Sequence, residues 1–130
     1  MREDETISVL VVDDSAAYRG AARAVVDLTE GFTCVADAEN GEDALTKARA
    51  LHPALVLMDV NMPGIGGCEA ARRLRAELPR TVVMLMSTYD SIGAPGTAEG
   101  CGASYYLRKE EFSPAMLRRL WDRFVPPKAA

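Results

Sequence analysis

Long hydrophobic runs and an apolar leader are absent from this 130-residue sequence. Its longest apolar segments, residues 7–12 and 54–58, are far shorter than the roughly 20 residues needed to span a bilayer. The N-terminus is acidic and lacks the apolar stretch of a secretory signal peptide. We therefore expect a cytoplasmic protein with no membrane partner.

A basic excess and paired metal-binding motifs are also missing. Nineteen acidic against fifteen basic residues leave a net charge of −4, whereas nucleic-acid binding requires a basic stripe. We therefore expect no direct nucleic-acid binding by this domain. The three cysteines lie far apart without CxxC or Cys/His spacing, so we expect small buried hydrophobic residues in a reducing compartment. The single histidine, His52, precedes a proline and is expected in a surface turn.

The sequence does contain a regular alternation of two kinds of segment. Short β-branched or apolar runs alternate with segments whose apolar residues recur at helical spacing. The expected strands cover residues 7–12, 32–38, 54–58, 81–86 and 104–107. Strands that alternate with helices form a parallel sheet covered on both faces, and right-handed crossovers make it doubly wound.

Polar residues follow four of the expected strands. Asp13 and Asp14 follow the first, Asp59 the third, Ser87 the fourth and Lys109 the fifth. In such folds ligands bind outside the carboxyl ends of the strands. Crowded carboxylates are relieved by protonation or by a cation, and oxygen ligands suit Mg²⁺. A hydroxyl and an ammonium beside them indicate phosphoryl transfer onto a carboxylate.

Each of these residues also has a plainer interpretation. An Asp-Asp pair after a strand is usually a helix-capping turn, and a lysine at a strand end is usually solvated. However, only three lysines occur beside twelve arginines, and Lys109 is one of them. Such residues at four strand ends together are far less expected by chance than any one of them alone, and this favours a shared site.

Four motifs in this order resemble the receiver domain of bacterial two-component response regulators. They are VVDDS (residues 11–15), LMDVNMPG (57–64), MST (86–88) and GASYYLRK (102–109). Within this family, the sequence is most similar to receivers that precede a LuxR-type DNA-binding domain. The resemblance implies a flavodoxin-like α/β fold with strand order 2-1-3-4-5. It covers residues 1–125, with 126–130 as a tail or linker.

The resemblance also implies roles for the acidic residues. Asp59 would accept a phosphoryl group from a sensor histidine kinase, from a phosphotransfer protein or from acetyl phosphate. The cofactor would be Mg²⁺, ligated by Asp14, Asp59 and the backbone carbonyl of Asn61, with Asp13 acting through water. Lys109 would pair with Asp59 before phosphorylation and with a phosphoryl oxygen afterwards.

Two further positions correspond to the family's switch residues. The Ser87 hydroxyl would bond the phosphoryl group, and Tyr106 would rotate inward as Ser87 moves; a plain core aromatic is the alternative for Tyr106. The family usually has proline, often after a cis bond, where this sequence has Glu110. A cis bond before a non-proline residue is costly, so we expect Lys109 to be held less rigidly.

The leading functional hypothesis is a phosphorylation-controlled signalling switch that is not a turnover enzyme. Its output would pass through an effector domain or protein, for example in transcription regulation, and a second copy of the chain is a candidate partner. One alternative is a receiver-like interaction module that works without phosphorylation. Another is a Mg²⁺-dependent phosphohydrolase, but such enzymes require an acid where this sequence has Asn61.

Residues 90–103, where the family places its fourth helix, contain four glycines and one proline. A full helix there would forfeit roughly 5 kcal/mol of intrinsic propensity. We therefore predict a fourth helix of at most one or two turns from Thr97 onward, with a mobile loop over 89–96. Such a segment could become ordered on phosphorylation, and it weakens the case for dimerisation through this surface.

Overall fold

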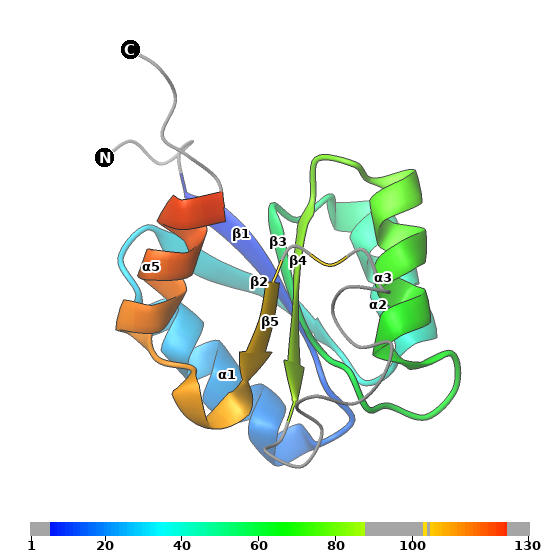
Figure 1. The fold of residues 1–130 in the computed structure, drawn as a ribbon, viewed down its shortest axis with the longest axis horizontal. Helices are drawn as coiled ribbons and strands as arrows, with labels where there is room; N and C mark the ends of the chain where they lie inside the picture. Colours follow the sequence, from blue (N-terminus) through cyan, green and yellow to red (C-terminus); the bar gives the residue numbers. More distant parts are fainter. Residues whose placement is uncertain (1–5, 88–102, 104, 125–130) are drawn as a thin grey trace.

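The computed structural model describes residues 6–87, 103 and 105–124. These residues form a five-stranded parallel sheet with the order β2-β1-β3-β4-β5 and with helices on both faces (Figure 1). The predicted doubly wound, flavodoxin-like architecture is therefore confirmed. The prediction of a short or disordered fourth helix lies outside the described residues.

From the first strand to the fourth, the described strands and helices alternate along the chain as predicted. Their bounds are β1 (Ile7–Val12), α1 (Ala16–Leu28), β2 (Phe32–Ala38), α2 (Gly41–Leu51), β3 (Leu55–Asp59), α3 (Gly66–Glu77), β4 (Val82–Ser87), β5 (Tyr105–Arg108), the 3-10 turn η3 (Lys109–Glu111) and α5 (Pro114–Phe124). The third, fourth and fifth strands lie one residue later than predicted. Asp59 and Ser87 are consequently the last residues of their strands.

Side-chain caps set the start of two helices. The Ser15 hydroxyl accepts a hydrogen bond from the Tyr18 amide at 3.1 Å, and the Ser113 hydroxyl accepts one from the Met116 amide at the same distance. Each cap satisfies an amide that has no partner within its helix. The Ser15 cap fixes the first turn of α1 next to the end of β1.

Alternate residues of the strands pack into two separate hydrophobic clusters. Successive side chains of a strand point to opposite faces, so each central strand supplies both clusters. One cluster packs against α2 and α3; its largest members include Leu10, Met58, Leu74 and Leu85. The other packs against α1 and α5; it includes Val11, Leu57, Met84, Met86 and Leu117. Both faces of the sheet are therefore covered by helices.

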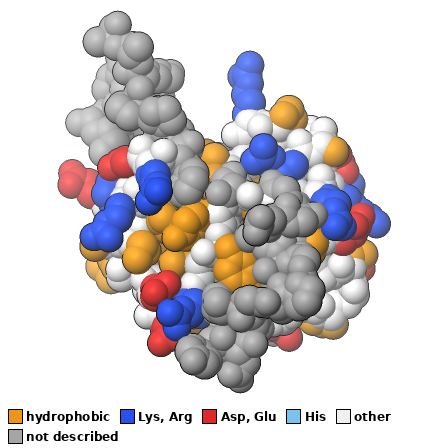
Figure 2. Space-filling model, viewed as in Figure 1, with side chains coloured by type: hydrophobic (Ala, Val, Ile, Leu, Met, Phe, Trp, Pro, Cys, Tyr) orange, Lys and Arg blue, Asp and Glu red, His pale blue; other side chains and the backbone are white. Residues whose placement is uncertain are grey.

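Charged side chains of both signs are mixed on the face seen in Figure 2, and hydrophobic side chains are visible near its centre beside α5. No helix among the described residues is long and apolar enough to cross a membrane.

Two of the three cysteines belong to the described part of the chain. Cys34 and Cys68 are both half-buried, and each packs against one of the two hydrophobic clusters. The predicted hydrophobic surroundings are thus found for these two, with burial that is partial rather than complete. His52 is exposed, as predicted, and ends α2 with a left-handed backbone of φ 49°.

Candidate functional site

The register of the sheet brings the acidic residues together. Val12 of β1 pairs with Met58 of β3, so the next residues of the two strands, Asp13 and Asp59, come to the same edge. The Asp13 amide also donates to the Ala38 carbonyl at 3.0 Å, which ties the end of β1 to the end of β2. The predicted meeting of these strand ends is confirmed.

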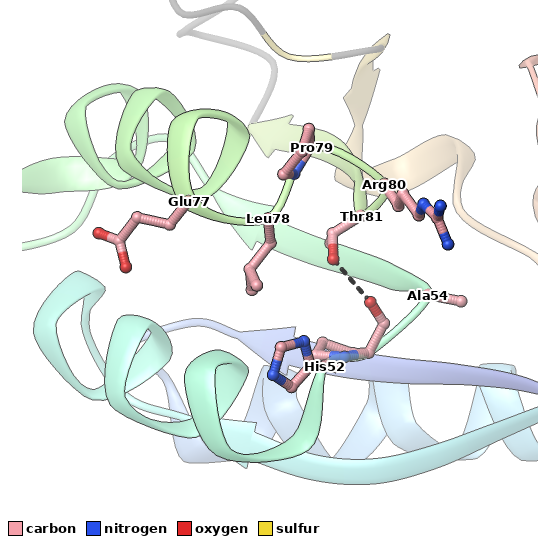
Figure 3. Close-up of a pocket in the computed structure, with 8 residues that line it drawn as sticks. His52, Ala54, Glu77, Leu78, Pro79, Arg80 and Thr81 are labelled. Atoms are coloured by element: carbon pink, nitrogen blue, oxygen red, sulfur yellow. Dashed lines mark hydrogen bonds between the residues drawn. The ribbon is translucent and has the colours of Figure 1, made fainter.

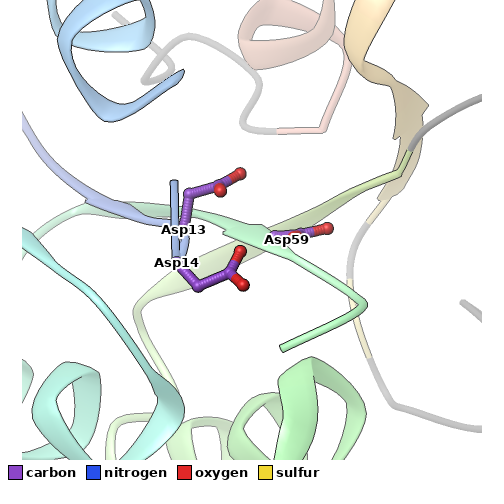
Figure 4. Close-up of side chains that lie close together, drawn as sticks. All are labelled: Asp13, Asp14 and Asp59. Atoms are coloured by element: carbon purple, nitrogen blue, oxygen red, sulfur yellow. The ribbon is translucent and has the colours of Figure 1, made fainter. Parts of the chain in front are cut away.

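Three carboxylates converge at this edge. Asp13, Asp14 and Asp59 each offer one oxygen, and these oxygens all lie within 4.8 Å of one another (Figure 4). Asp13 and Asp59 are buried, whereas Asp14 is exposed. Carboxylates this close repel one another unless a proton or a cation intervenes. Oxygen ligands with one side open to water fit Mg²⁺.

Lys109 supplies a positive charge to the same cluster. Its Nζ lies 2.6 Å from Asp13 Oδ2 and 3.5 Å from Asp59 Oδ2. The backbone at Lys109 enters the 3-10 turn, which the Phe112 amide closes by donating to the Lys109 carbonyl at 3.2 Å. The peptide between Lys109 and Glu110 is trans. The family usually has proline after this lysine, whereas this chain has Glu110 within a hydrogen-bonded 3-10 turn.

Burial raises the pKa of Asp59 above its ordinary value. The charge of Lys109 and a backbone N–H of Asn61, which donates to Asp59 Oδ1 at 3.2 Å, lower this pKa and offset part of the effect, while the nearby Asp13 raises it further. A cation beside Asp59 would favour its charged form in the same way as Lys109 does.

Ser87 contributes a buried hydroxyl group that has no hydrogen-bond partner among the described residues. The residue is fully buried at the end of β4, and its Oγ makes no hydrogen bond within the described part of the chain. Buried hydroxyls normally find a partner, so an orphaned one next to a carboxylate cluster indicates a ligand that brings its own acceptor. Phosphoryl oxygens are such acceptors.

The remaining predicted residues lie around this edge. The Asn61 side chain is exposed, and its backbone follows Asp59 closely enough for the amide contact described above. Tyr106 is half-buried and packs against the cluster beneath α2 and α3. Its role as a rotating switch stays a prediction, as does the carbonyl of Asn61 as a metal ligand.

Sequence reasoning missed two residues of α1 at this site. The Lys109 ammonium lies 4.4 Å from the centre of the Tyr18 ring, and Arg19 donates to the Asp13 carbonyl at 2.8 Å. The sequence places Tyr18 only on the apolar face of a helix. The Ser15 cap was the available signal, because a helix that starts directly after Asp14 must extend its first turn over the strand ends.

Gly67 allows the loop after Asp59 to close tightly. A Cβ at this position would overlap the Asp59 carbonyl oxygen and lie 2.8 Å from the Cα of Val60. The Gly67 amide donates to the Val60 carbonyl at 3.2 Å. Only glycine fits this approach, which brings the start of α3 against the end of β3.

A separate hollow lies elsewhere on the described part of the chain. It has a volume of about 560 Å³ and is lined by the segments that precede β3 and β4, residues 52–54 and 77–81 (Figure 3). Because the strands are parallel, this is the edge opposite to the carboxylates. Within it the Thr81 hydroxyl donates to the Pro53 carbonyl at 2.9 Å. The hollow is therefore separate from the acidic cluster.

Comparison with known proteins decides the family. The family model of the response regulator receiver domain matches residues 9–120. The chain belongs to this family. The receiver is 44% identical to the response regulator GacA of Pseudomonas protegens over 130 residues, which cover 95% of this chain and 61% of GacA. It is 35% identical to the response regulator UvrY of Escherichia coli over 103 residues, covering 79% of this chain and 47% of UvrY.

Solved structures give the same result. The receiver superposes on the signal receiver domain of the response regulator NarL from Mycobacterium tuberculosis with a TM-score of 0.83 and 28% identity, covering 95% of this chain and 99% of that one. A LuxR-family DNA-binding response regulator from Staphylococcus aureus gives a TM-score of 0.79 at 25% identity, with coverages of 91% and 98%. This protein is thus a receiver domain of two-component response regulators, as the motifs indicated. It spans about half to three-fifths of the length of GacA and UvrY.

Proposed function

We propose that Asp59 is the phosphoacceptor of this receiver and that its phosphorylation, with Mg²⁺ as cofactor, switches a protein-interaction surface. The observation that carries the proposal is the surroundings of Asp59. Its carboxylate lies 3.5 Å from an ammonium and within 4.8 Å of two further carboxylates. The neighbouring strand ends in a buried hydroxyl that has no partner in the described part of the chain. These are the groups that phosphoryl transfer to a carboxylate requires.

The transfer forms one bond to phosphorus and breaks one, so atoms and charge balance. An oxygen of Asp59 attacks the phosphorus atom, and the bond from phosphorus to the leaving group breaks. A histidine nitrogen of a sensor kinase or phosphotransfer protein, or the carboxylate of acetyl phosphate, leaves with the electron pair. The product is an acyl phosphate on Asp59.

The residues around Asp59 would bind the phosphoryl oxygens and the metal ion. Lys109 would hold a phosphoryl oxygen by an ion pair, and Ser87 would hold another by a hydrogen bond. Asp14, Asp59 and the Asn61 carbonyl would hold Mg²⁺, with Asp13 contributing through water. When bound, Mg²⁺ supplies positive charge that neutralises phosphoryl oxygens. Tyr106 would respond by rotating as Ser87 moves towards the phosphoryl group.

A signalling switch fits this site better than a turnover enzyme. A hydrolase with an aspartyl nucleophile requires a general acid near the leaving group, and the sequence position that would supply it holds Asn61, whose amide cannot exchange a proton. The retained acids, Ser87 and Lys109 likewise disfavour a module that works without phosphorylation. We therefore propose slow loss of the phosphoryl group rather than catalytic turnover.

The downstream effect of the switch would come from an effector. The relatives are longer than the region that matches this receiver. One relative, of Brevibacillus brevis, is called transcriptional regulatory protein DegU, and it is 32% identical over 114 residues, or 48% of its length. We propose a cytoplasmic receiver over residues 1–125 and a tail or linker over 126–130. An effector domain or protein, and a second copy of the chain, are the proposed partners. Sequencing the complete open reading frame tests whether it encodes an effector domain.

The direct experiment is phosphorylation with a small donor. The protein is incubated with acetyl phosphate with and without Mg²⁺, and the covalent phosphoryl group is detected by intact-mass spectrometry. We expect modification of the wild type only with Mg²⁺, none of Asp59→Asn, and normal modification of Asp122→Asn, which alters an exposed carboxylate on α5. Modification of Asp59→Asn would contradict the assignment. So would an unmodified wild type that also fails with beryllofluoride and with a kinase.

A further inference from the structure

An aromatic ring closes the third side of the Lys109 ammonium. Two sides face carboxylates, Asp13 Oδ2 at 2.6 Å and Asp59 Oδ2 at 3.5 Å. On the third, the centre of the Tyr18 ring lies 4.4 Å from Nζ. This separation is well within the range of a cation–π contact, in which the ring quadrupole attracts the positive charge.

Tyr18 is itself held at two points. Its amide donates to the Ser15 hydroxyl at 3.1 Å, which fixes its backbone in the first turn of α1. Its hydroxyl contacts Met86 Sδ at 3.8 Å, on β4 directly before Ser87. The ring thus spans from α1 to β4 above the ends of the central strands. A ring anchored at both ends is a fixed surface against which a flexible lysine can rest.

The tyrosine remains a neutral phenol at this position. Burial, followed by the charges of Asp13 and Asp59, raises the pKa of Tyr18 to about 12. The hydroxyl therefore stays protonated at neutral pH, and the contact with Lys109 is one of ring and cation rather than of two charges. The aromatic ring, and not the hydroxyl, is the group that acts on the ammonium.

We infer that Tyr18 is a positioning residue for phosphoryl transfer, because its ring holds the Lys109 ammonium over the gap between Asp13 and Asp59. The lysine side chain has four rotatable methylene groups and exchanges partners readily. With the ring in place, the ammonium is confined to the volume where a phosphoryl oxygen of Asp59 would arrive. The inference rests on the proposed function for its consequence, but the contact can be tested separately.

The contact is tested by NMR of protein labelled with ¹³C-lysine. The sequence has three lysines, so three ε-methylene signals are expected, and Lys109→Arg assigns one of them. The ring current of Tyr18 should shift the Lys109 signal upfield of those of Lys47 and Lys128 and make its two ε-protons inequivalent. Tyr18→Phe, which keeps the ring, should preserve both features, and Tyr18→Leu should abolish them.

Phosphorylation by acetyl phosphate supplies the functional test. A cation–π contact at a partly buried site corresponds to about a three- to ten-fold effect, so we expect Tyr18→Leu to slow phosphorylation by roughly that factor. Tyr18→Phe should recover most of the rate. The matched control is Tyr105→Leu, which removes a half-buried tyrosine from the same hydrophobic cluster and should leave the Lys109 signal shifted.

The outcomes separate this inference from the proposed function. A wild-type Lys109 signal in Tyr18→Leu, or a Tyr18→Phe variant as slow as Tyr18→Leu, overturns the positioning role. If the wild type is not phosphorylated at all, the proposed function fails, and the NMR comparison still decides whether the ring holds the lysine. Circular dichroism checks folding, and Tyr18→Met replaces Tyr18→Leu if the branched side chain prevents folding.

Discussion

The Lys109 ammonium is bound more closely to Asp13 than to Asp59, with Nζ 2.6 Å from the Oδ2 atom of Asp13. The Asp13 side chain is 1% exposed, so this ion pair is buried. Removing one member of a buried ion pair leaves an uncompensated charge and is strongly destabilising. The pair therefore anchors Lys109, and the longer 3.5 Å contact leaves the carboxylate of Asp59 more open to a reacting group.

Asp59→Asn should raise the free energy of unfolding at neutral pH without Mg²⁺, on the order of 1 kcal/mol. Burial raises the pKa of Asp59, so the native state binds its proton more tightly than the unfolded state does. The ionised carboxylate therefore costs stability at neutral pH. The cost diminishes as the pH falls through the raised pKa towards the unfolded value of about 3.9.

Urea unfolding of both proteins across this pH range measures the difference. The advantage of Asp59→Asn should shrink steadily as the pH falls. Asp122→Asn is the control and should show no comparable gain. An advantage that grows towards acid pH would contradict the direction of the Asp59 pKa.

Asp14 should contribute more to Mg²⁺ binding than any acid outside the cluster. It is the exposed member of the three, and it is not paired with Lys109, so its oxygens are open to a metal. We expect Asp14→Asn to weaken Mg²⁺ binding, measured by calorimetry, by about ten-fold or more. Asp43→Asn, which removes the carboxylate that pairs with Lys47 at 3.2 Å, should bind normally. Equal affinities in the two variants would refute a ligand role for Asp14.

Ser87→Ala should leave the stability of the unphosphorylated protein unchanged or slightly higher, because the buried Ser87 hydroxyl makes no hydrogen bond among the described residues. Thr81→Val provides the contrast, since it removes a buried hydroxyl that donates to the Pro53 carbonyl at 2.9 Å. That loss should cost about 1 kcal/mol or more in chemical denaturation. Ser87→Ala should nevertheless weaken beryllofluoride binding. A stability loss as large as that of Thr81→Val would show that Ser87 has a structural partner.

Gly67→Ala should destabilise the protein, because the added Cβ overlaps the carbonyl oxygen of Asp59 and approaches Val60. We expect a loss of at least about 1–3 kcal/mol, the usual cost of an overpacked site. Gly20→Ala is the matched control in α1, where a Cβ meets nothing within 4 Å. It should stabilise the helix by up to about 1 kcal/mol. Thermal unfolding of the two variants should therefore shift in opposite directions.

The sequence alone determined which residues share the functional edge. Alternation of apolar strands with amphipathic segments requires a parallel sheet, and in a parallel sheet all carboxyl ends lie on one side. Asp13, Asp59, Ser87 and Lys109 could therefore be assigned to one site before any distance was known. The helix starts at Ser15 and Ser113 were equally readable, because capping depends on residues only three positions apart.

Only the tertiary structure decided how these residues meet. The packing of α1, β4 and the turn after β5 places Lys109 nearer to Asp13 than to Asp59 and sets the Tyr18 ring beside it. The same packing leaves the Ser87 hydroxyl without a partner among the residues that the structure describes. Periodicity in a sequence records which face of an element is buried, whereas distances between side chains follow from long-range packing that no local pattern contains.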